Sequence, residues 1–194
     1  MQFNIISPDQ YRTVTWKNGK GRTQELVFGG SCVDSFDWRL SMAPVNSSGE
    51  FSDFKHYDRT LILINGNGLT LDHDSGQQDS LSQRFDLAHF DGGWLTNATL
   101  HDGDILDFNV MTRQHKCCSK VTVLDDVNSN SQTLFVSAGL LLIYSVESAI
   151  SILSSDSSAI TLPAMHLFQT ESAKSGQWAI TGGPVVCVQI SYLA

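Results

Sequence analysis

Apolar and polar residues alternate along much of this chain. The pattern is clearest in segment 36–45, where every second residue is apolar: Phe36, Trp38, Leu40 and Met42. Segments 106–113 and 186–193 show the same period of two. This period is typical of a β-strand that buries one face, because successive side chains point to opposite sides. No segment keeps helical spacing over three turns, so the sequence predicts an all-β protein with little helix.

Short strand-like runs recur along the rest of the chain, with turn signals such as Asn65–Gly68 between them. The further runs are 59–64, 120–124, 133–136, 140–146, 149–153 and 166–170. Many short strands joined by frequent turns indicate a sandwich or a barrel. The pattern of strands and turns is also weakly repeated in the two halves of the chain. We therefore expect two similar β units, residues 1–125 and 126–194, which pack closely enough to share strands.

Composition places the chain among folded globular proteins and narrows its partners. Of its 194 residues, 41% are hydrophobic and 16% are charged, and the formal net charge is −8. An acidic surface repels phosphate groups, so we expect no nucleic-acid partner. The N-terminal residues do not read as a signal peptide, and no apolar run has the length of a bilayer. The four cysteines form no CxxC pair, so we expect reduced thiols, a cytoplasmic location and no membrane partner.

The segment 49–71 and the later Gly103–Asp104 pair resemble the two sequence motifs of cupins. A metal-binding cupin presents a His-x-His pair, a Glu and a later His that converge on one ion. Here Phe54 and His56 occupy the expected His-x-His positions, and after the second motif the next histidine is His115. We therefore expect neither a metal nor another cofactor.

Four blocks of sequence resemble the HutD/Ves family. They include Trp-Lys-Asn-Gly and Asp-Phe-Asn-x-Met-x-Arg, and they lie at 16–25, 36–45, 49–68 and 107–113. The resemblance implies a two-barrel cupin (bicupin) of jelly-roll type. It also implies a non-catalytic role in histidine utilisation, such as sensing or buffering a pathway intermediate. Two positions depart from the family pattern: Lys20 stands in place of a frequent Gly, and Gln114 in place of a frequent second Arg.

Two pairs of polar residues are candidates to hold a small anion. Lys17 and Asn18 lie in a Gly-containing turn, where backbone N–H groups can approach an anion; a solvated hairpin turn is the alternative. Arg39 and Ser41 share the polar face of one strand about 7 Å apart, so one ligand can contact both. Inward polar residues of a barrel line its cavity. Alternation alone leaves an outward, solvated face open.

Three further candidates share one face of the strand at 106–113: Asp107, Asn109 and Arg113. Asp107 and Asn109 are neighbours on that face. Arg113 lies about 20 Å from Asp107 along an extended strand, so one small ligand cannot contact all three. Arg113 is instead expected to pair with an acid on an adjacent strand. A structural hydrogen-bond network is the alternative for the whole group.

Arg59 follows Asp58 directly at the start of an apolar strand. It either binds an anion or neutralises Asp58. A buried arginine needs a partner, so we expect Glu25 to pair with Arg39 or Arg59 in the same cavity. His56 completes the candidate ligand-binding set as a hydrogen-bonding group.

These residues predict a protein that binds a small carboxylated metabolite. The resemblance to the HutD/Ves family implies a histidine-pathway intermediate, such as formylglutamate or urocanate, and a regulatory or accessory role in histidine catabolism. An acidic protein needs a local cationic pocket for such a ligand, and arginines would supply it. One alternative is a metal-independent isomerase that uses His56 with Asp58 or Asp107 as a base. The other is a protein-interaction module. No nucleophile motif is present, so binding is favoured over catalysis, and a homodimer formed through sheet edges is compatible with each reading.

Overall fold

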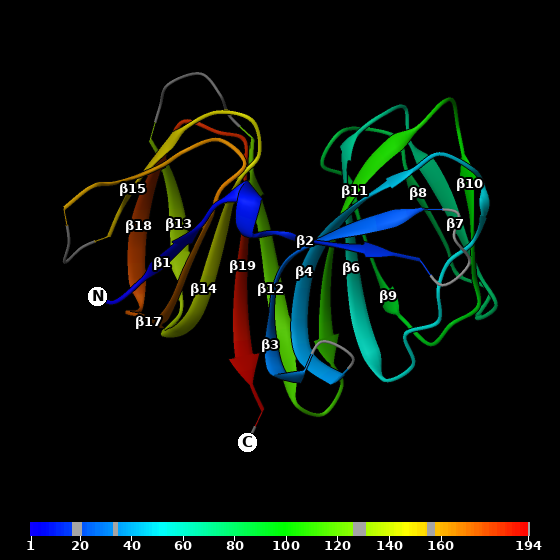
Figure 1. The fold of residues 1–194 in the computed structure, drawn as a ribbon, viewed down its shortest axis with the longest axis horizontal. Coiled ribbons are helices and arrows are strands. Elements are labelled where there is room, and N and C mark those ends of the chain that lie inside the picture. The colour runs from blue at the N-terminus through cyan, green and yellow to red at the C-terminus, as the bar shows by residue number, and fades with distance from the viewer. Residues whose placement is uncertain (17–20, 33–34, 126–130, 155–157, 194) are drawn as a thin grey trace. The chain divides into compact units, whose positions relative to one another are not determined.

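The computed structural model describes residues 1–16, 21–32, 35–125, 131–154 and 158–193. These residues form strands β1 to β19 and one short 3-10 helix, η1 (Pro8–Gln10) (Figure 1). The predicted all-β class with little helix is confirmed. Across the described ranges, no helix is long and apolar enough to cross a membrane. Contacts group the chain into a first β unit, Arg12–Cys118 with Leu193–Ala194, and a second β unit, Met1–Tyr11 with Ser119–Tyr192.

The first β unit contains a six-stranded and a four-stranded sheet. The six-stranded sheet has the order β2 (Arg12–Thr15), β3 (Arg22–Cys32), β4 (Ser35–Val45), β11 (Ile105–Arg113), β6 (Tyr57–Asn65) and β9 (Leu87–Asp91). The four-stranded sheet has the order β5 (Gly49–Glu50), β10 (Thr96–Leu100), β7 (Leu69–His73) and β8 (Gln78–Leu81). Leu61 and Leu63 of one sheet share a buried cluster with Leu69 and Leu71 of the other, so this core joins the two sheets.

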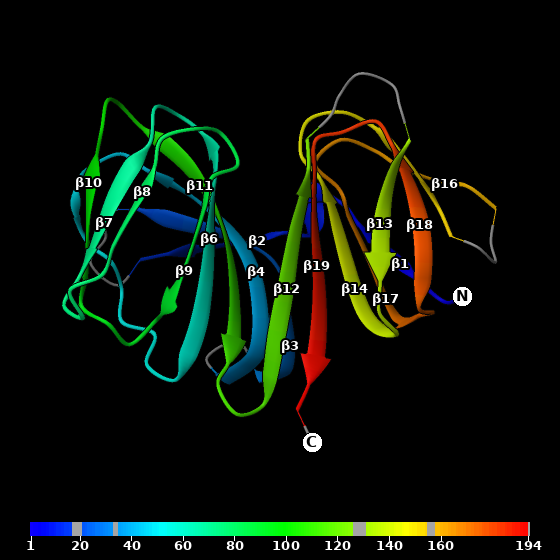
Figure 2. The same cartoon turned by 180° about the vertical axis from the view of Figure 1, so that it is seen from behind.

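The second β unit has a five-stranded and a four-stranded sheet. The five-stranded sheet has the order β1 (Asn4–Ile6), β17 (Leu167–Ala173), β14 (Gly139–Ser145), β19 (Val185–Tyr192) and β12 (Cys117–Leu124); Figure 2 shows β12 beside β19. The four-stranded sheet has the order β13 (Gln132–Val136), β18 (Gly176–Thr181), β15 (Ile150–Leu153) and β16 (Ile160–Leu162). Phe168 and Trp178 lie in the core of this unit, with ring centroids 6.3 Å apart.

The first strand of the chain belongs to the second β unit. β1 pairs antiparallel with β17, and Asn4 lies opposite Gln169. The sequence predicts two consecutive segments that meet after residue 125, whereas the contacts join the first eleven residues to the C-terminal strands. A long-range strand pair of this kind leaves no local signal, because each partner satisfies its backbone groups with a distant segment.

The register of the six-stranded sheet decides which side chains share a face. Met111 of β11 lies opposite Arg39 of β4 and Arg59 of β6. Two residues earlier, Asn109 lies opposite Ser41 and Leu61. Directly opposed residues of neighbouring strands point to the same side of the sheet. Since Leu61 is a core residue, the polar residues of this row point into the interior of the first β unit.

Gly29 on β3 lies directly against the ring of Trp38 on β4. A methyl group at Gly29 would overlap the buried Trp38 indole. We therefore expect Gly29→Ala to lower the free energy of unfolding by about 2–3 kcal/mol, because the indole has to move inside a packed core. Urea denaturation measures this, with Gly93→Ala as control, where an added Cβ would meet nothing closer than 3.2 Å. Equal stability of the two variants would contradict this packing.

Candidate functional site

Arg59 is a buried cation surrounded by aromatic rings. Only 5% of the residue is exposed. Its guanidinium carbon lies 5.3, 5.5 and 5.1 Å from the ring centroids of Phe51, Phe54 and Phe90. The faces of aromatic rings attract a cation and partly replace the water that it loses. Burial nevertheless lowers the pKa of Arg59 to about 10, so desolvation outweighs the neighbouring negative charge.

A chain of two hydrogen bonds connects Arg59 to Asp107. Arg59 Nη2 donates to Asn109 Oδ1 over 2.8 Å, and Asn109 Nδ2 donates to Asp107 Oδ1 over 2.8 Å. All three side chains are buried. Burial raises the pKa of Asp107 to about 7, while the positive charge of Arg59 opposes that rise. The guanidinium and the carboxyl group are thus linked through an amide.

Arg39 lies one strand beyond Met111 in the same row, and opposed residues on β4 and β6 are about 10 Å apart. Its Nη2 lies 3.2 Å from the Met111 sulfur, and its guanidinium carbon lies 5.0 Å from the Phe54 centroid. Both arginines therefore contact the Phe54 ring. The ring centroid of Phe36 also lies 4.6 Å from the guanidinium carbon of Arg39. Burial lowers the pKa of Arg39, and the negative charge of Glu25 opposes this.

Glu25 supplies negative charge beside Arg39. Its register partners are Arg12 on β2 and Ser41 on β4. Glu25 Oε1 lies 3.7 Å from Arg12 Nε, and Oε2 lies 4.0 Å from Arg39 Nη1. The predicted proximity of Glu25 to Arg39 is therefore observed, although 4.0 Å is too long for a hydrogen bond. Ser41 is buried between Glu25 and Asn109 in the register of the sheet.

Three buried polar atoms of this site have no hydrogen-bond partner among the residues that the structure describes: Glu25 Oε2, Arg39 Nε and Arg59 Nε. Leaving a buried donor or acceptor unpaired costs free energy, and native proteins pair most such groups. Three of them close together indicate a place where a ligand or ordered water completes the network. We name the set Glu25, Arg39, Ser41, Arg59, Asp107 and Asn109 the arginine site.

Four of the candidate residues from the sequence lie apart from the arginine site or outside the described residues. Lys17 and Asn18 lie outside the described residues. His56 is exposed, adopts a positive φ of 72°, and accepts a backbone hydrogen bond from Gln114 through its carbonyl. The carboxylates proposed to work with it have other partners, since Asp58 accepts from Gln114 Nε2 and Asp107 from Asn109 Nδ2.

Arg113, the fourth of these candidates, ties the ends of three strands together. It donates to the backbone oxygen of Phe36 over 3.1 Å and to the hydroxyls of Ser35 and Tyr57 over 2.8 and 2.6 Å. It also approaches Asp37, on the adjacent strand β4, at 3.9 Å. These contacts give Arg113 a structural role at the edge of the arginine site.

We expect Arg113→Met to lower the free energy of unfolding by about 2 kcal/mol, because it leaves a carbonyl and two hydroxyls without their charged donor. Thermal or urea unfolding measures the effect. Lys116→Met is the control, since Lys116 pairs with the same Asp37 at 3.0 Å but is 56% exposed. Exposed ion pairs contribute about 0–1 kcal/mol. Equal losses in the two variants would contradict a structural role for Arg113.

The aromatic residues around the arginines were missed by the sequence reasoning. Phe90 is the register partner of Arg59, so the strand pairing would have found it. Phe51 and Phe54 come from the segment between β5 and β6, whose path no period of two describes. Their rings are half-buried and cover the guanidinium groups. Met111 lies on the same face of β11 as Asp107 and Asn109. The period of two in the sequence was therefore the available signal for its place in the site.

A buried histidine with a carboxylate partner was also missed. His73 on β7 contacts Thr96 Oγ1 through Nδ1 at 2.8 Å and Asp79 Oδ2 through Nε2 at 3.1 Å. Its ring lies 4.8 Å from that of Phe90. His73 follows Leu69 and Leu71 in the alternation, which was the signal for its burial. In the described part of the chain, no three His, Cys, Asp or Glu side chains gather as metal ligands.

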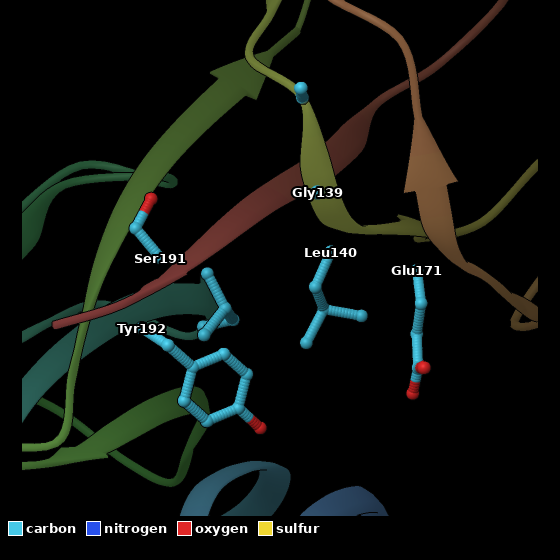
Figure 3. A pocket seen from close by; sticks show the side chains of 7 residues that line it. Gly139, Leu140, Glu171, Ser191 and Tyr192 are labelled. Carbon is cyan, nitrogen blue, oxygen red and sulfur yellow. The ribbon is translucent and has the colours of Figure 1, made fainter. Parts of the chain in front are cut away.

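A surface pocket of about 410 Å³ lies in the second β unit (Figure 3). It is lined by Ala138, Gly139, Leu140, Glu171, Ile190, Ser191 and Tyr192. Glu171 and Tyr192 are exposed at its wall. No guanidinium lines this pocket, whereas charged groups and unpaired buried atoms converge at the arginine site. The chemistry therefore favours the arginine site as the functional one.

Comparisons with known proteins place the chain in a family. The HutD family model matches residues 8–188. An uncharacterized 21.2 kDa protein in the hutC 3' region of Pseudomonas putida is 30% identical over 152 residues, which are 78% of this chain and 77% of that protein. Protein Ves of Escherichia fergusonii is 32% identical over 130 residues, 64% of this chain and 68% of that protein.

Solved structures show the same fold over the whole chain. HutD from Pseudomonas fluorescens SBW25, solved in a formate condition, is 25% identical with a TM-score of 0.83, and a conserved protein of unknown function from Pseudomonas aeruginosa PAO1 is 27% identical with a TM-score of 0.86; both alignments cover 100% of each chain. Lactobacillus farciminis oxalate decarboxylase, at 10% identity and a TM-score of 0.61 over 97% of this chain and 85% of its own, shares the fold alone. The fold is thus cupin-like, and the sequence and structure comparisons agree that this chain belongs to the HutD family.

Proposed function

We propose that the arginine site binds the carboxylate of a small metabolite. The observation that carries this proposal is the pair of buried, unpartnered Nε donors on Arg59, which is buried, and on Arg39, which is partly buried. A carboxylate is the acceptor that matches a guanidinium in charge and in geometry. Because the site is desolvated, each such hydrogen bond contributes more than it would at an exposed surface.

The aromatic rings fit the remainder of such a ligand. Phe54 contacts both arginines, and Phe51 and Phe90 flank Arg59. Rings in this position exclude water and offer flat apolar surface to a planar or aliphatic chain. Small-molecule sites commonly combine an apolar lining with a few polar groups that fix orientation.

Family membership suggests which metabolite to test. The Pseudomonas putida relative is described by its position in the hutC 3' region. On this basis we propose a regulatory or accessory role in histidine catabolism, in the cytoplasm, with urocanate, formiminoglutamate or formylglutamate as the ligand. We also propose that the two β units correspond to the two barrels of a bicupin.

Calorimetric titration with these three compounds tests the proposal, with thermal unfolding as a second readout. We expect saturable heat at one site per chain and a rise in Tm for at least one compound, because a ligand that binds only the folded state stabilises it. The methyl ester of the same compound is the control, since it lacks the charge that the guanidinium groups recognise. Neither heat nor a Tm shift from any of the three compounds would overturn the proposal.

A further inference from the structure

Glu25 has an acceptor that the binding of a carboxylate alone leaves unused. Its side chain is buried, with only 4% of the residue exposed. Oε1 faces Arg12, but Oε2 accepts no hydrogen bond from the described residues and lies 4.0 Å from Arg39 Nη1. That separation provides charge pairing without a hydrogen bond. The arginine site therefore contains an unfilled acceptor as well as unfilled donors.

The sheet fixes this acceptor near the donors. Glu25 and Ser41 are register partners on β3 and β4, and Arg39 is two residues from Ser41 on the same face. The β3–β4 register shifts between Glu25 and Val27. Such an irregularity re-aims side chains on the affected strand. One small molecule can consequently reach the Arg39 guanidinium and Glu25 Oε2 together, because Arg39 Nη1 and Glu25 Oε2 lie only 4.0 Å apart.

The charge of Glu25 favours a donor at its free acceptor. Glu25 lies near Arg12 and Arg39, and Arg59 is linked to Asp107 through Asn109. A ligand carboxylate can bind beside a guanidinium, but a carboxylate placed at Glu25 Oε2 would be repelled. A hydrogen-bond donor at that atom has no such penalty.

We propose that the arginine site selects molecules that carry a carboxylate together with an N–H or O–H donor, and that Glu25 Oε2 accepts the hydrogen bond of this donor. The inference rests on the proposed function and adds the class of ligand to it. Glu25 acts as a specificity-determining residue, and carboxylates without a donor bind more weakly.

A matched pair of ligands tests this directly. trans-Urocanate carries a carboxylate and an imidazole N–H, whereas trans-3-(2-furyl)acrylate keeps the acrylate and a five-membered aromatic ring but has no N–H. We expect wild-type protein to bind urocanate at least tenfold more tightly in calorimetric titration. Glutarate, with two carboxylates and no donor, is expected to bind as weakly as the furan. Because these measurements use unmodified protein, they do not depend on the folding of a variant.

Glu25→Gln assigns the selectivity to Glu25. The neutral amide is a weaker acceptor than a carboxylate, so the ratio of urocanate to furylacrylate affinity is expected to fall at least threefold. Glu171→Gln, the same change in the second β unit, is the control and is expected to keep the ratio. Equal affinity of wild type for the two ligands, or a ratio unchanged by Glu25→Gln, overturns this inference but leaves carboxylate binding intact. Absence of binding by all carboxylates overturns the proposed function itself.

Discussion

Replacing Arg59 with Met is expected to weaken carboxylate binding about 100-fold, since the loss of one desolvated charge-assisted contact costs about 3 kcal/mol. Methionine keeps the apolar part of the side chain among Phe51, Phe54 and Phe90 but donates no hydrogen bond. Arg59→Lys keeps the charge without the planar fork of donors, so it is expected to give an intermediate loss. Calorimetric titration with the tightest of the tested carboxylates measures both.

The matched control is Arg84→Met. Arg84 also lies over a phenylalanine, with its guanidinium carbon 4.6 Å from the Phe85 centroid, but it is exposed and outside the arginine site. Its replacement is expected to leave affinity within about twofold of wild type, because the exposed stacking contact is worth only about 0.5–1 kcal/mol and does not touch the ligand. Unchanged affinity in a folded Arg59→Met protein would remove Arg59 from the site.

Asp107 is expected to make stability depend on pH between about 4 and 7. Its pKa is about 7 in the folded protein, against 3.8 for an ordinary aspartate. As the pH rises through this interval, the unfolded chain releases the proton first and the folded chain retains it. The unfolded state is therefore favoured progressively, and the free energy of unfolding falls by about 4 kcal/mol before it levels off above pH 7.

Asp107→Asn removes this titration while it keeps an oxygen that can accept from Asn109 Nδ2. Urea denaturation of both proteins at several pH values between 4 and 8 measures the effect. We expect the stability of wild type relative to this variant to decrease as the pH rises. Parallel pH profiles for the two proteins would mean that Asp107 ionises normally, contrary to the rise in pKa that its burial causes.

The same ionisation is expected to influence binding. Ionised Asp107 competes with a ligand carboxylate for the charge of Arg59, to which Asn109 connects it. Carboxylate affinity should therefore be higher at pH 6 than at pH 8 in wild type, and the difference should be smaller in Asp107→Asn. Calorimetric titration at the two pH values provides the measurement.

Alternation in the sequence was enough to predict several of the strands, among them β4, β11 and β19, and much of the shared face. The period of two along 106–113 places Asp107 and Asn109 on one side, and the structure joins their side chains by a hydrogen bond. The alternation likewise places Arg39 and Ser41 on one side of β4, and both side chains point into the first β unit. The physical reason is that side-chain direction in a strand is a local property fixed by the pleat.

Other features depend on contacts between distant segments, which one sequence does not reveal. Alternation cannot choose between inward and outward faces, and here the register with Leu61 decides it. The position of Phe54 over both arginines depends on an irregular segment, and the partner of His73 lies on a neighbouring strand. The alternation also fails at Phe36, because the β3–β4 register shifts beside it and its ring lies against Arg39.

The most direct test is a crystal structure of the protein soaked with the tightest-binding carboxylate. We expect the ligand carboxylate within about 3.2 Å of the guanidinium nitrogens of Arg39 or Arg59, with Phe54 beside it. A ligand bound instead in the pocket formed by β14, β17 and β19, with both guanidinium groups left unpaired, would contradict carboxylate recognition by the arginine site.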